Sequence, residues 1–117
     1  MQLAVIDGNN NPQMICTLAP AAAMVDLSGT IAAGGLSQQL AAANPGRSGW
    51  AVYNPNSTPL YLNDMGVAAT NSIGTGNGSF VLPANTLLTS TMLGYCSTLA
   101  LNVFAVATGS GFIARVW

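Results

Sequence analysis

Short apolar runs separated by clusters of turn-forming residues constrain the fold of this chain more than any other feature of its sequence. Residues 3–6 and 14–18 are such runs, and the stretch between them is rich in Gly, Asn and Pro. Strands of β-sandwiches and barrels have this length and spacing, whereas helices need longer periodic stretches. The sequence therefore predicts an all-β chain with little or no helix.

The clearest predicted strand covers residues 49–54, where Trp50 and Val52 fall on one face and Ala51 and Tyr53 on the other. A turn at 55–59 leads into a second strand at 60–63. Gly34 and Gly35 indicate a tight turn, and residues 64–79 a long excursion rich in Gly, Asn and Thr. Further strands are predicted over residues 3–6, 14–18, 30–32, 36–40, 80–82, 86–91, 98–108 and 112–117.

The length of the chain limits how these strands are organised. With 117 residues, the sequence predicts a single β domain over 1–117, in which residues 1–18 form a possible N-terminal hairpin or arm. Two packed antiparallel sheets accommodate roughly eight to ten short strands most economically. We therefore expect an antiparallel β-sandwich, jelly-roll-like, with a closed β-barrel as the alternative.

The scarcity of ionisable side chains excludes many functions. Only 4% of the residues are charged, and the chain has no histidine, whereas globular domains carry about a quarter charged residues. The two arginines and the absence of lysine argue against nucleic-acid binding, Schiff-base chemistry and a phosphate-binding loop. We therefore predict no catalysis, no cofactor and no metal. A small hydrolase stays possible only if two of Asp7, Asp26 and Asp64 lie within about 10 Å of each other.

The two cysteines and the N-terminus bear on the cellular compartment. Cys16 and Cys96 lack the spacing of a metal site, and the favoured interpretation is two reduced thiols, although pairing stays open. The N-terminal residues lack the charged and apolar regions of a signal peptide, and no apolar segment approaches the ~20 residues that span a bilayer. We expect synthesis in the cytoplasm and no contact with a membrane.

Uncharged strand edges indicate that the chain works in an assembly. Proteins commonly prevent strand edges from pairing with one another by placing charged side chains there, above all lysine. Because this chain has almost no such side chains, we expect other subunits to cover some of its edges and apolar faces. The composition therefore predicts a homo-oligomer or a component of a larger structure.

Six residues are candidate partner contacts. Arginine and tryptophan are enriched at interfaces, and the last strand places Arg115 on the face that it shares with Ile113 and Trp117. For Arg47 the alternative is a local partner, either Asp64 or backbone carbonyls; for Trp117 it is a place in the core. The predicted contact residues are Met1, Leu3, Val5, Arg47, Arg115 and Trp117.

Three aromatic residues have two interpretations. Trp50, Tyr53 and Tyr61 could form a platform on which a sugar stacks, but core packing with cross-strand pairing is the favoured interpretation.

Part of the chain resembles a family of viral proteins. Residues 28–31 (Ser-Gly-Thr-Ile), 34–40 (Gly-Gly-Leu-Ser-Gln-Gln-Leu), 44–50 (Asn-Pro-Gly-Arg-Ser-Gly-Trp) and 53–63 (Tyr-Asn-Pro-Asn-Ser-Thr-Pro-Leu-Tyr-Leu-Asn) occur in this order. This pattern resembles the small β-rich virion proteins of tailed bacteriophages, of the capsid decoration (cement) type. The resemblance covers about a third of the chain, and its motifs are short.

The resemblance implies a structural role in a virion, on the capsid surface, after synthesis in the host cytoplasm. As a decoration protein, the chain would stabilise the head by bridging major capsid subunits, with the major capsid protein and copies of itself as partners. The expected contact regions are residues 1–6, 64–79 and 115–117. The alternative is a tail or fibre accessory module that binds carbohydrate on the host surface.

Overall fold

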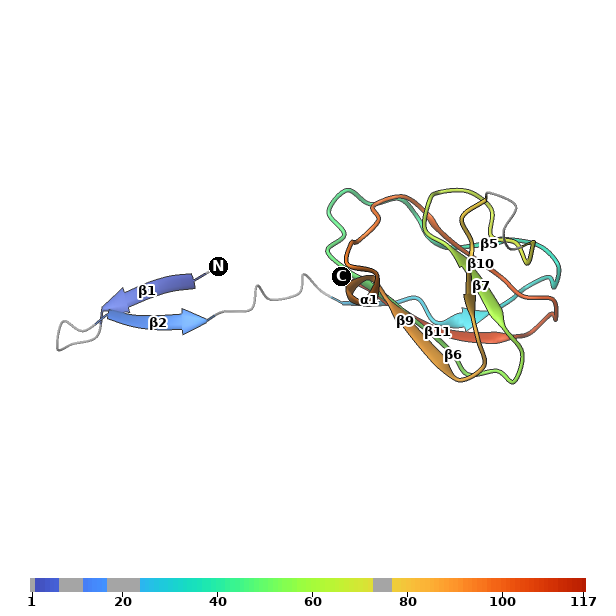
Figure 1. The fold of residues 1–117 in the computed structure, drawn as a ribbon, viewed down its shortest axis with the longest axis horizontal. Helices are drawn as coiled ribbons and strands as arrows, with labels where there is room; N and C mark the ends of the chain where they lie inside the picture. Colours follow the sequence, from blue (N-terminus) through green and yellow to red (C-terminus); the bar gives the residue numbers. More distant parts are fainter. Residues whose placement is uncertain (1, 7–11, 17–23, 73–76) are drawn as a thin grey trace.

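The computed structural model describes residues 2–6, 12–16, 24–72 and 77–117 (Figure 1). Strands β1 (Gln2–Ile6) and β2 (Pro12–Cys16) pair antiparallel, with Leu3 opposite Ile15 and Val5 opposite Gln13. They form a two-stranded sheet of their own, without pairing to any other described strand. Met1 and residues 7–11 and 17–18, which belong to the expected arm, lie outside the described residues.

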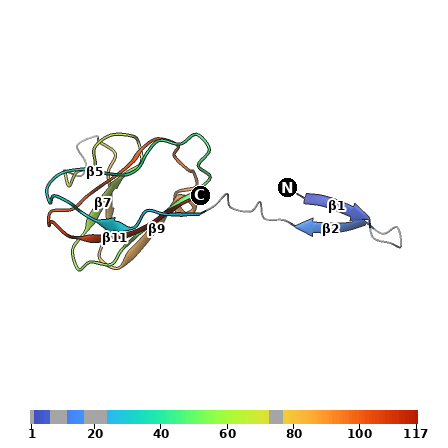
Figure 2. The same ribbon diagram turned by 180° about the vertical axis from the view of Figure 1, so that it is seen from behind.

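The remaining strands form two antiparallel sheets that pack together, as Figure 2 shows from behind. One sheet has the order β5 (Gln38–Ala41), β10 (Leu101–Phe104), β7 (Leu60–Asn63), β8 (Phe80–Leu82). The other has the order β3 (Val25–Asp26), β11 (Gly111–Val116), β6 (Trp50–Asn54), β9 (Thr86–Thr89), and β4 (Gly29–Thr30) also pairs with β11. The predicted β-sandwich is confirmed, and these strands do not close into a barrel.

The order of the strands is that of a jelly roll. Strands β7 and β8 pair as the innermost hairpin, and β6 with β9, β5 with β10, and β3 and β4 with β11 pair successively further out along the chain. When β3 and β4 count as one interrupted strand, the described part of the sandwich has the eight strands of that fold. The chain is thus a long hairpin rolled into two layers.

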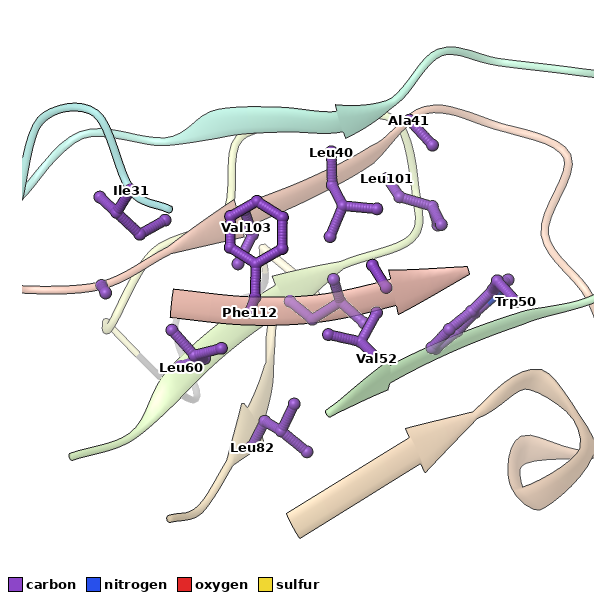
Figure 3. Close-up of a cluster of buried hydrophobic side chains, with 13 residues drawn as sticks. Ile31, Leu40, Ala41, Trp50, Val52, Leu60, Leu82, Leu101, Val103 and Phe112 are labelled. Carbon is purple, nitrogen blue, oxygen red and sulfur yellow. The ribbon is translucent and has the colours of Figure 1, made fainter. Parts of the chain in front are cut away.

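Alternation along the strands produces the core between the sheets (Figure 3). Trp50 and Val52 of β6 are almost wholly buried, as are Leu60 and Leu62 of β7, while Ala51, Tyr53 and Tyr61 point to the outward faces. The predicted grouping of Trp50 with Val52 and of Ala51 with Tyr53 is therefore confirmed, and the structure shows that the first pair is the buried one. The core cluster contains Ile31, Leu40, Ala41, Trp50, Val52, Leu60, Leu62, Leu82, Leu101, Val103, Ala105, Phe112 and Ala114.

Buried asparagines hold the loops that follow β6 and β7. The Asn54 side chain is fully buried, and its Nδ2 donates to the carbonyl oxygens of Thr58 and Leu82, each at 2.9 Å. The Asn63 side chain is also fully buried, and its Nδ2 donates to the Asn77 carbonyl at 2.6 Å. Both amides supply the hydrogen bonds that buried loop backbone requires.

The tight turn predicted at Gly34 and Gly35 is present, with the Leu36 N–H donating to the Ala33 carbonyl at 3.3 Å, but the strands on either side of it are Gly29–Thr30 and Gln38–Ala41 rather than 30–32 and 36–40. Strand β4 pairs with β11 and β5 with β10, so the segment between them crosses from one sheet to the other. Gly34 is needed for a close approach, because a Cβ there would overlap the carbonyl oxygen of Val106. The Gly35 N–H donates to the Ala105 carbonyl at 2.8 Å, which ties the crossing to the far end of β10.

Two predicted strands are shorter than expected. The strand predicted over 86–91 ends at Thr89, whose side chain accepts from the Met92 N–H and caps the short helix α1 (Ser90–Leu93). The strand predicted over 98–108 is regular only over β10; the side chain of Arg47 takes the carbonyl oxygens of Ser97 and Leu99 before this strand, and the Gly35 N–H takes the Ala105 carbonyl after it. In both places side-chain hydrogen bonds to the backbone replace ladder bonds.

Truncation of Leu62 tests the core. Leu62 has no exposed surface, whereas Leu36 keeps 64% of its surface exposed. We expect Leu62→Ala to lower the free energy of unfolding by about 2–5 kcal/mol, and the same truncation at Leu36 to change it by less than about 0.5 kcal/mol. Denaturant unfolding followed by tryptophan fluorescence measures both, and equal losses would contradict the assigned core.

Candidate interaction surface

The outward faces of the two sheets differ in what covers them. On the β5–β10–β7–β8 sheet, Asn102 Nδ2 donates to the Val67 carbonyl at 2.8 Å, and Asn63 holds the Asn77 carbonyl. The Ala69 N–H donates to Ser37 Oγ at 2.9 Å, and the Ala69 side chain is buried. The described residues of the predicted 64–79 excursion therefore lie across this sheet, and the chain itself occupies much of the face.

The outward face of the other sheet carries an apolar row. The strand register places Ile113 of β11 opposite Tyr53 of β6, and Tyr53 opposite Leu87 of β9. Ile113 is 42% exposed and Leu87 46%, while Tyr53 between them is partly buried. Three neighbouring strands thus present a continuous line of apolar side chains to the outside.

The next two rows of this face contain both of its charged groups and the last aromatic residue. Arg115 is exposed and lies opposite Ala51 on one side and Asp26 of the short strand β3 on the other. Trp117 exchanges backbone hydrogen bonds with Gly49, and its ring lies where a Cβ on Gly49 would be. Glycine at position 49 therefore provides the place for the Trp117 ring on the sheet.

We call the set Tyr53, Leu87, Ile113, Arg115 and Trp117 the open face. Aromatic residues and arginine are the side chains enriched at protein interfaces and at their energetic centres. Lysine and glutamate, which are depleted at interfaces, are absent from the whole chain. The composition of the open face suits it to binding a protein surface.

Sequence reasoning found only part of the open face. Arg115 and Trp117 were predicted as contacts, and the structure places Arg115 on the exposed face with Ile113, as the alternation predicted. The Trp117 ring has a partly buried place within its own chain, against Gly49. Leu87 was missed, because only the register of β6 with β9 brings it to Tyr53.

The prediction of Arg47 as a partner contact is not supported, because the side chain is only 6% exposed. Its guanidinium donates to the carbonyl oxygens of Ala42, Ser97 and Leu99 at 2.6–3.0 Å. The alternative of a local backbone partner is therefore the correct one. Arg47 joins the segment after β5 to the segment before β10, and it is a structural residue of the sandwich.

The hydrolase hypothesis required two neighbouring carboxylates. Asp26 is exposed on β3 of one sheet, whereas Asp64 follows β7 of the other sheet and is 1% exposed. Asp7 lies outside the described residues.

Asp64 contacts two residues of the segment between α1 and β10. The Asp64 carbonyl accepts a hydrogen bond from Ser97 Oγ. Partial burial raises the pKa of Tyr95, and a hydrogen bond with the Asp64 carboxyl raises it further.

The three aromatic residues of the possible sugar platform do not come together. Trp50 has no exposed surface, since it belongs to the core. Tyr53 lies on the outward face of the β3–β11–β6–β9 sheet, while Tyr61 lies on the other sheet in edge-to-face contact with Phe104, at 5.9 Å between ring centres. The interpretation of core packing with cross-strand pairing is confirmed for Trp50 and Tyr61.

Apart from the open face, the described part of the chain offers only weak candidates for a functional site. Cys96 is a free, partly buried thiol beside a hollow of about 310 Å³ that Ser48, Ser90 and Tyr95 also line. The side chains of Cys16, Leu3 and Val5 lie outside the description, as does Met1. Within the described ranges, no three His, Cys, Asp or Glu side chains gather as metal ligands, and no helix is long and apolar enough to cross a bilayer.

Comparisons of the chain with protein-family models, with curated proteins and with solved structures found no match.

Substitution of Arg47 tests its structural role. Arg47→Ala leaves three carbonyl oxygens without their charged donor, and we expect a loss of about 3 kcal/mol or more in the free energy of unfolding. Arg47→Lys supplies one ammonium in place of a planar fork and should recover only part of this loss. Arg115→Ala, at the exposed arginine, is the control and should cost less than about 0.5 kcal/mol. Equal effects of the two alanine variants would contradict the assignment.

The titration of Asp26 tests how β3 is held to β11. Ser28 donates to the Asp26 carboxylate from its hydroxyl at 2.6 Å and from its N–H at 3.0 Å, and these bonds hold the pKa of Asp26 below its usual 3.8. The same hydroxyl accepts from the Ala114 N–H of β11. Because the folded pKa is lowered, this contribution to stability is present above the unfolded pKa and is lost as pH falls through the folded value.

In Ser28→Ala the hydroxyl donor is gone, so the pKa of Asp26 should rise toward 3.8. Carboxyl carbon chemical shifts measured against pH by NMR would follow the titration in both proteins. An unchanged titration midpoint would show that the Ser28 hydroxyl does not bind the carboxylate in solution.

Proposed function

We propose that the chain is a non-catalytic structural protein of a tailed-bacteriophage virion, a decoration protein that stabilises the head by bridging major capsid subunits. The open face is the observation that carries the proposal. It presents an apolar row beside an arginine and a tryptophan, whereas the chain itself covers much of the other sheet. A surface of this composition is typical of a protein that works by binding other proteins.

The charge content of the chain supports the same role. A net charge of −1 and the lack of lysine remove the means by which isolated β-proteins keep their edges apart. Of the four described edge strands of the sandwich, β5, β8 and β9 contain no charged residue, and β3 contains Asp26 alone. Permanent burial in an assembly is one way to protect such edges.

The fold and the sequence resemblance give the proposal its viral context. Jelly rolls recur in viral capsid domains, although they also occur in lectins and cupins, so the fold supports the role by analogy only. The resemblance of residues 28–63 to small virion proteins of tailed bacteriophages points to the capsid surface. Copies of this chain and the major capsid protein are the proposed partners.

The proposed mechanism is physical. The β1–β2 hairpin pairs only with itself among the described strands, so it leaves two strand edges for a neighbouring protein. We assign the shell contact to this hairpin. Many copies attached to one shell would resist expansion of the head through multivalent binding, even where each contact is weak.

Localisation in purified virus particles tests the proposed function. Antibody labelling and cryo-electron microscopy should place the chain on the outer surface of the head. Deletion of residues 1–6, which removes β1, should lower the number of copies per head at least tenfold while the circular dichroism of the sandwich is unchanged. The control is Val106→Lys, which alters an exposed residue of the loop after β10, away from the strand edges, and should leave occupancy unchanged. A tail location, or absence from particles, would overturn the proposal.

A further inference from the structure

We propose that the open face binds the open face of a second copy of the chain, about a two-fold axis that is parallel to β6 and lies midway between the two faces. The inference rests on the proposed function only in treating the open face as an interface. It assigns that face to contact between copies, and leaves the β1–β2 hairpin for the shell.

The charges on and beside the open face favour a partner without strong charge. Arg115 is the one charged member of the face, and Asp26 is its cross-strand neighbour, close enough for the arginine to contribute to the lowered pKa of the carboxyl. The two charges therefore largely cancel, and an acidic or a basic partner gains little there. A second copy, with a net charge of −1, meets almost no repulsion.

The apolar row is self-complementary about β6. Ile113 and Leu87 lie on either side of Tyr53, in register, and both are branched aliphatic side chains of nearly equal exposure. A two-fold rotation about an axis parallel to β6, in the plane between the two faces, places β11 of each copy over β9 of the other. It therefore packs Ile113 of each copy on Leu87 of the other and brings the two Tyr53 rings together at the axis.

The charged row is compatible with the same symmetry. Arg115 and Thr89 occupy the two sides of Ala51, so the rotation places Arg115 of one copy over Thr89 of the other. The arginine meets a neutral hydroxyl, which can accept its hydrogen bond, and stays away from the arginine of the second copy. No like charges meet at any paired position of the two rows.

The size of the face predicts a weak dimer. Strands of four to six residues, at about 3.3 Å per residue, give a face of about 13–20 Å along the strands, and three strands about 4.8 Å apart give about 15 Å across them. Standard interfaces bury about 800 Å² per partner, which is more than this face can supply. Association of the isolated chain should therefore need high concentrations, whereas neighbours held on one shell associate readily.

Sedimentation of the full-length chain over a concentration series tests the inference. The wild-type chain should form a reversible dimer, and Ile113→Lys should raise its dissociation constant at least tenfold, because a lysine then faces Leu87 of the other copy. The matched control is Val81→Lys on the other sheet, at a residue 43% exposed against 42% for Ile113. Circular dichroism checks that each variant is folded, and Leu87→Asp is the second single variant, expected to weaken the dimer likewise.

A mixture of the two single variants tests the register itself. When Ile113→Lys and Leu87→Asp chains are mixed, each heterodimer places the new lysine opposite the new aspartate and keeps one Ile113–Leu87 contact. The mixture should therefore dimerise at least tenfold more tightly than either variant alone. Tighter dimerisation of the mixture supports the two-fold axis parallel to β6. Within one chain Tyr53 lies between residues 113 and 87, so the new lysine and aspartate meet directly only across the dimer interface.

Three outcomes would overturn the inference. These are a wild-type chain that stays monomeric up to about 1 mM, equal effects of Ile113→Lys and Val81→Lys, and a mixture that dimerises no better than its components. If the chain is monomeric but Ile113→Lys removes it from heads, the open face binds the shell protein and only the dimer is refuted. If the dimer forms but particles lack the chain, the proposed function fails and the dimer stands.

Discussion

The need to satisfy buried backbone without charged side chains is the constraint on which the rest of this structure depends. A chain with five formal charges in 117 residues has few strong donors to hold its loops. It places one arginine inside, where Arg47 takes three carbonyl oxygens, and ends β6 and β7 with the fully buried amides of Asn54 and Asn63. Each of these groups donates hydrogen bonds to loop carbonyl oxygens that no strand ladder satisfies. The hydrophobic side chains cluster between the two sheets, while the charged side chains of Arg47 and Asp64 are buried outside that cluster.

Local pattern was sufficient to predict most of the strands, but not which strands pair with one another. The alternation in β6 grouped Trp50 with Val52 and Ala51 with Tyr53, because a period of two is visible within five residues, and the structure shows which of these pairs is buried. Gly34 and Gly35 mark a turn, but the local sequence does not show that the strands on either side of this turn belong to different sheets, because a glycine needed for close approach to Val106 looks the same as one needed only for a turn. The long-range partners of Arg47 lie some fifty positions away along the chain, and no local signal announces them.

The open face, too, could be predicted only in part from the local sequence. The alternation of the last strand was enough to group Ile113, Arg115 and Trp117. Tyr53 and Leu87 join them only through two antiparallel registers, which hydrogen bonding between distant segments decides. The most informative feature of the surface, a branched aliphatic residue on each side of a tyrosine, is therefore a property of the fold. It exists in no single stretch of sequence.

The described part of the 64–79 segment covers one sheet and leaves the other bare, and this gives the molecule a front and a back. In the two-fold pair proposed above, the two bare sheets face each other, so the two covered sheets lie on opposite outer sides of the dimer. The segment that covers the β5–β10–β7–β8 sheet therefore restricts face-to-face contact between copies to the bare sheet, and a pair formed in this way has no bare sheet left to add a third copy.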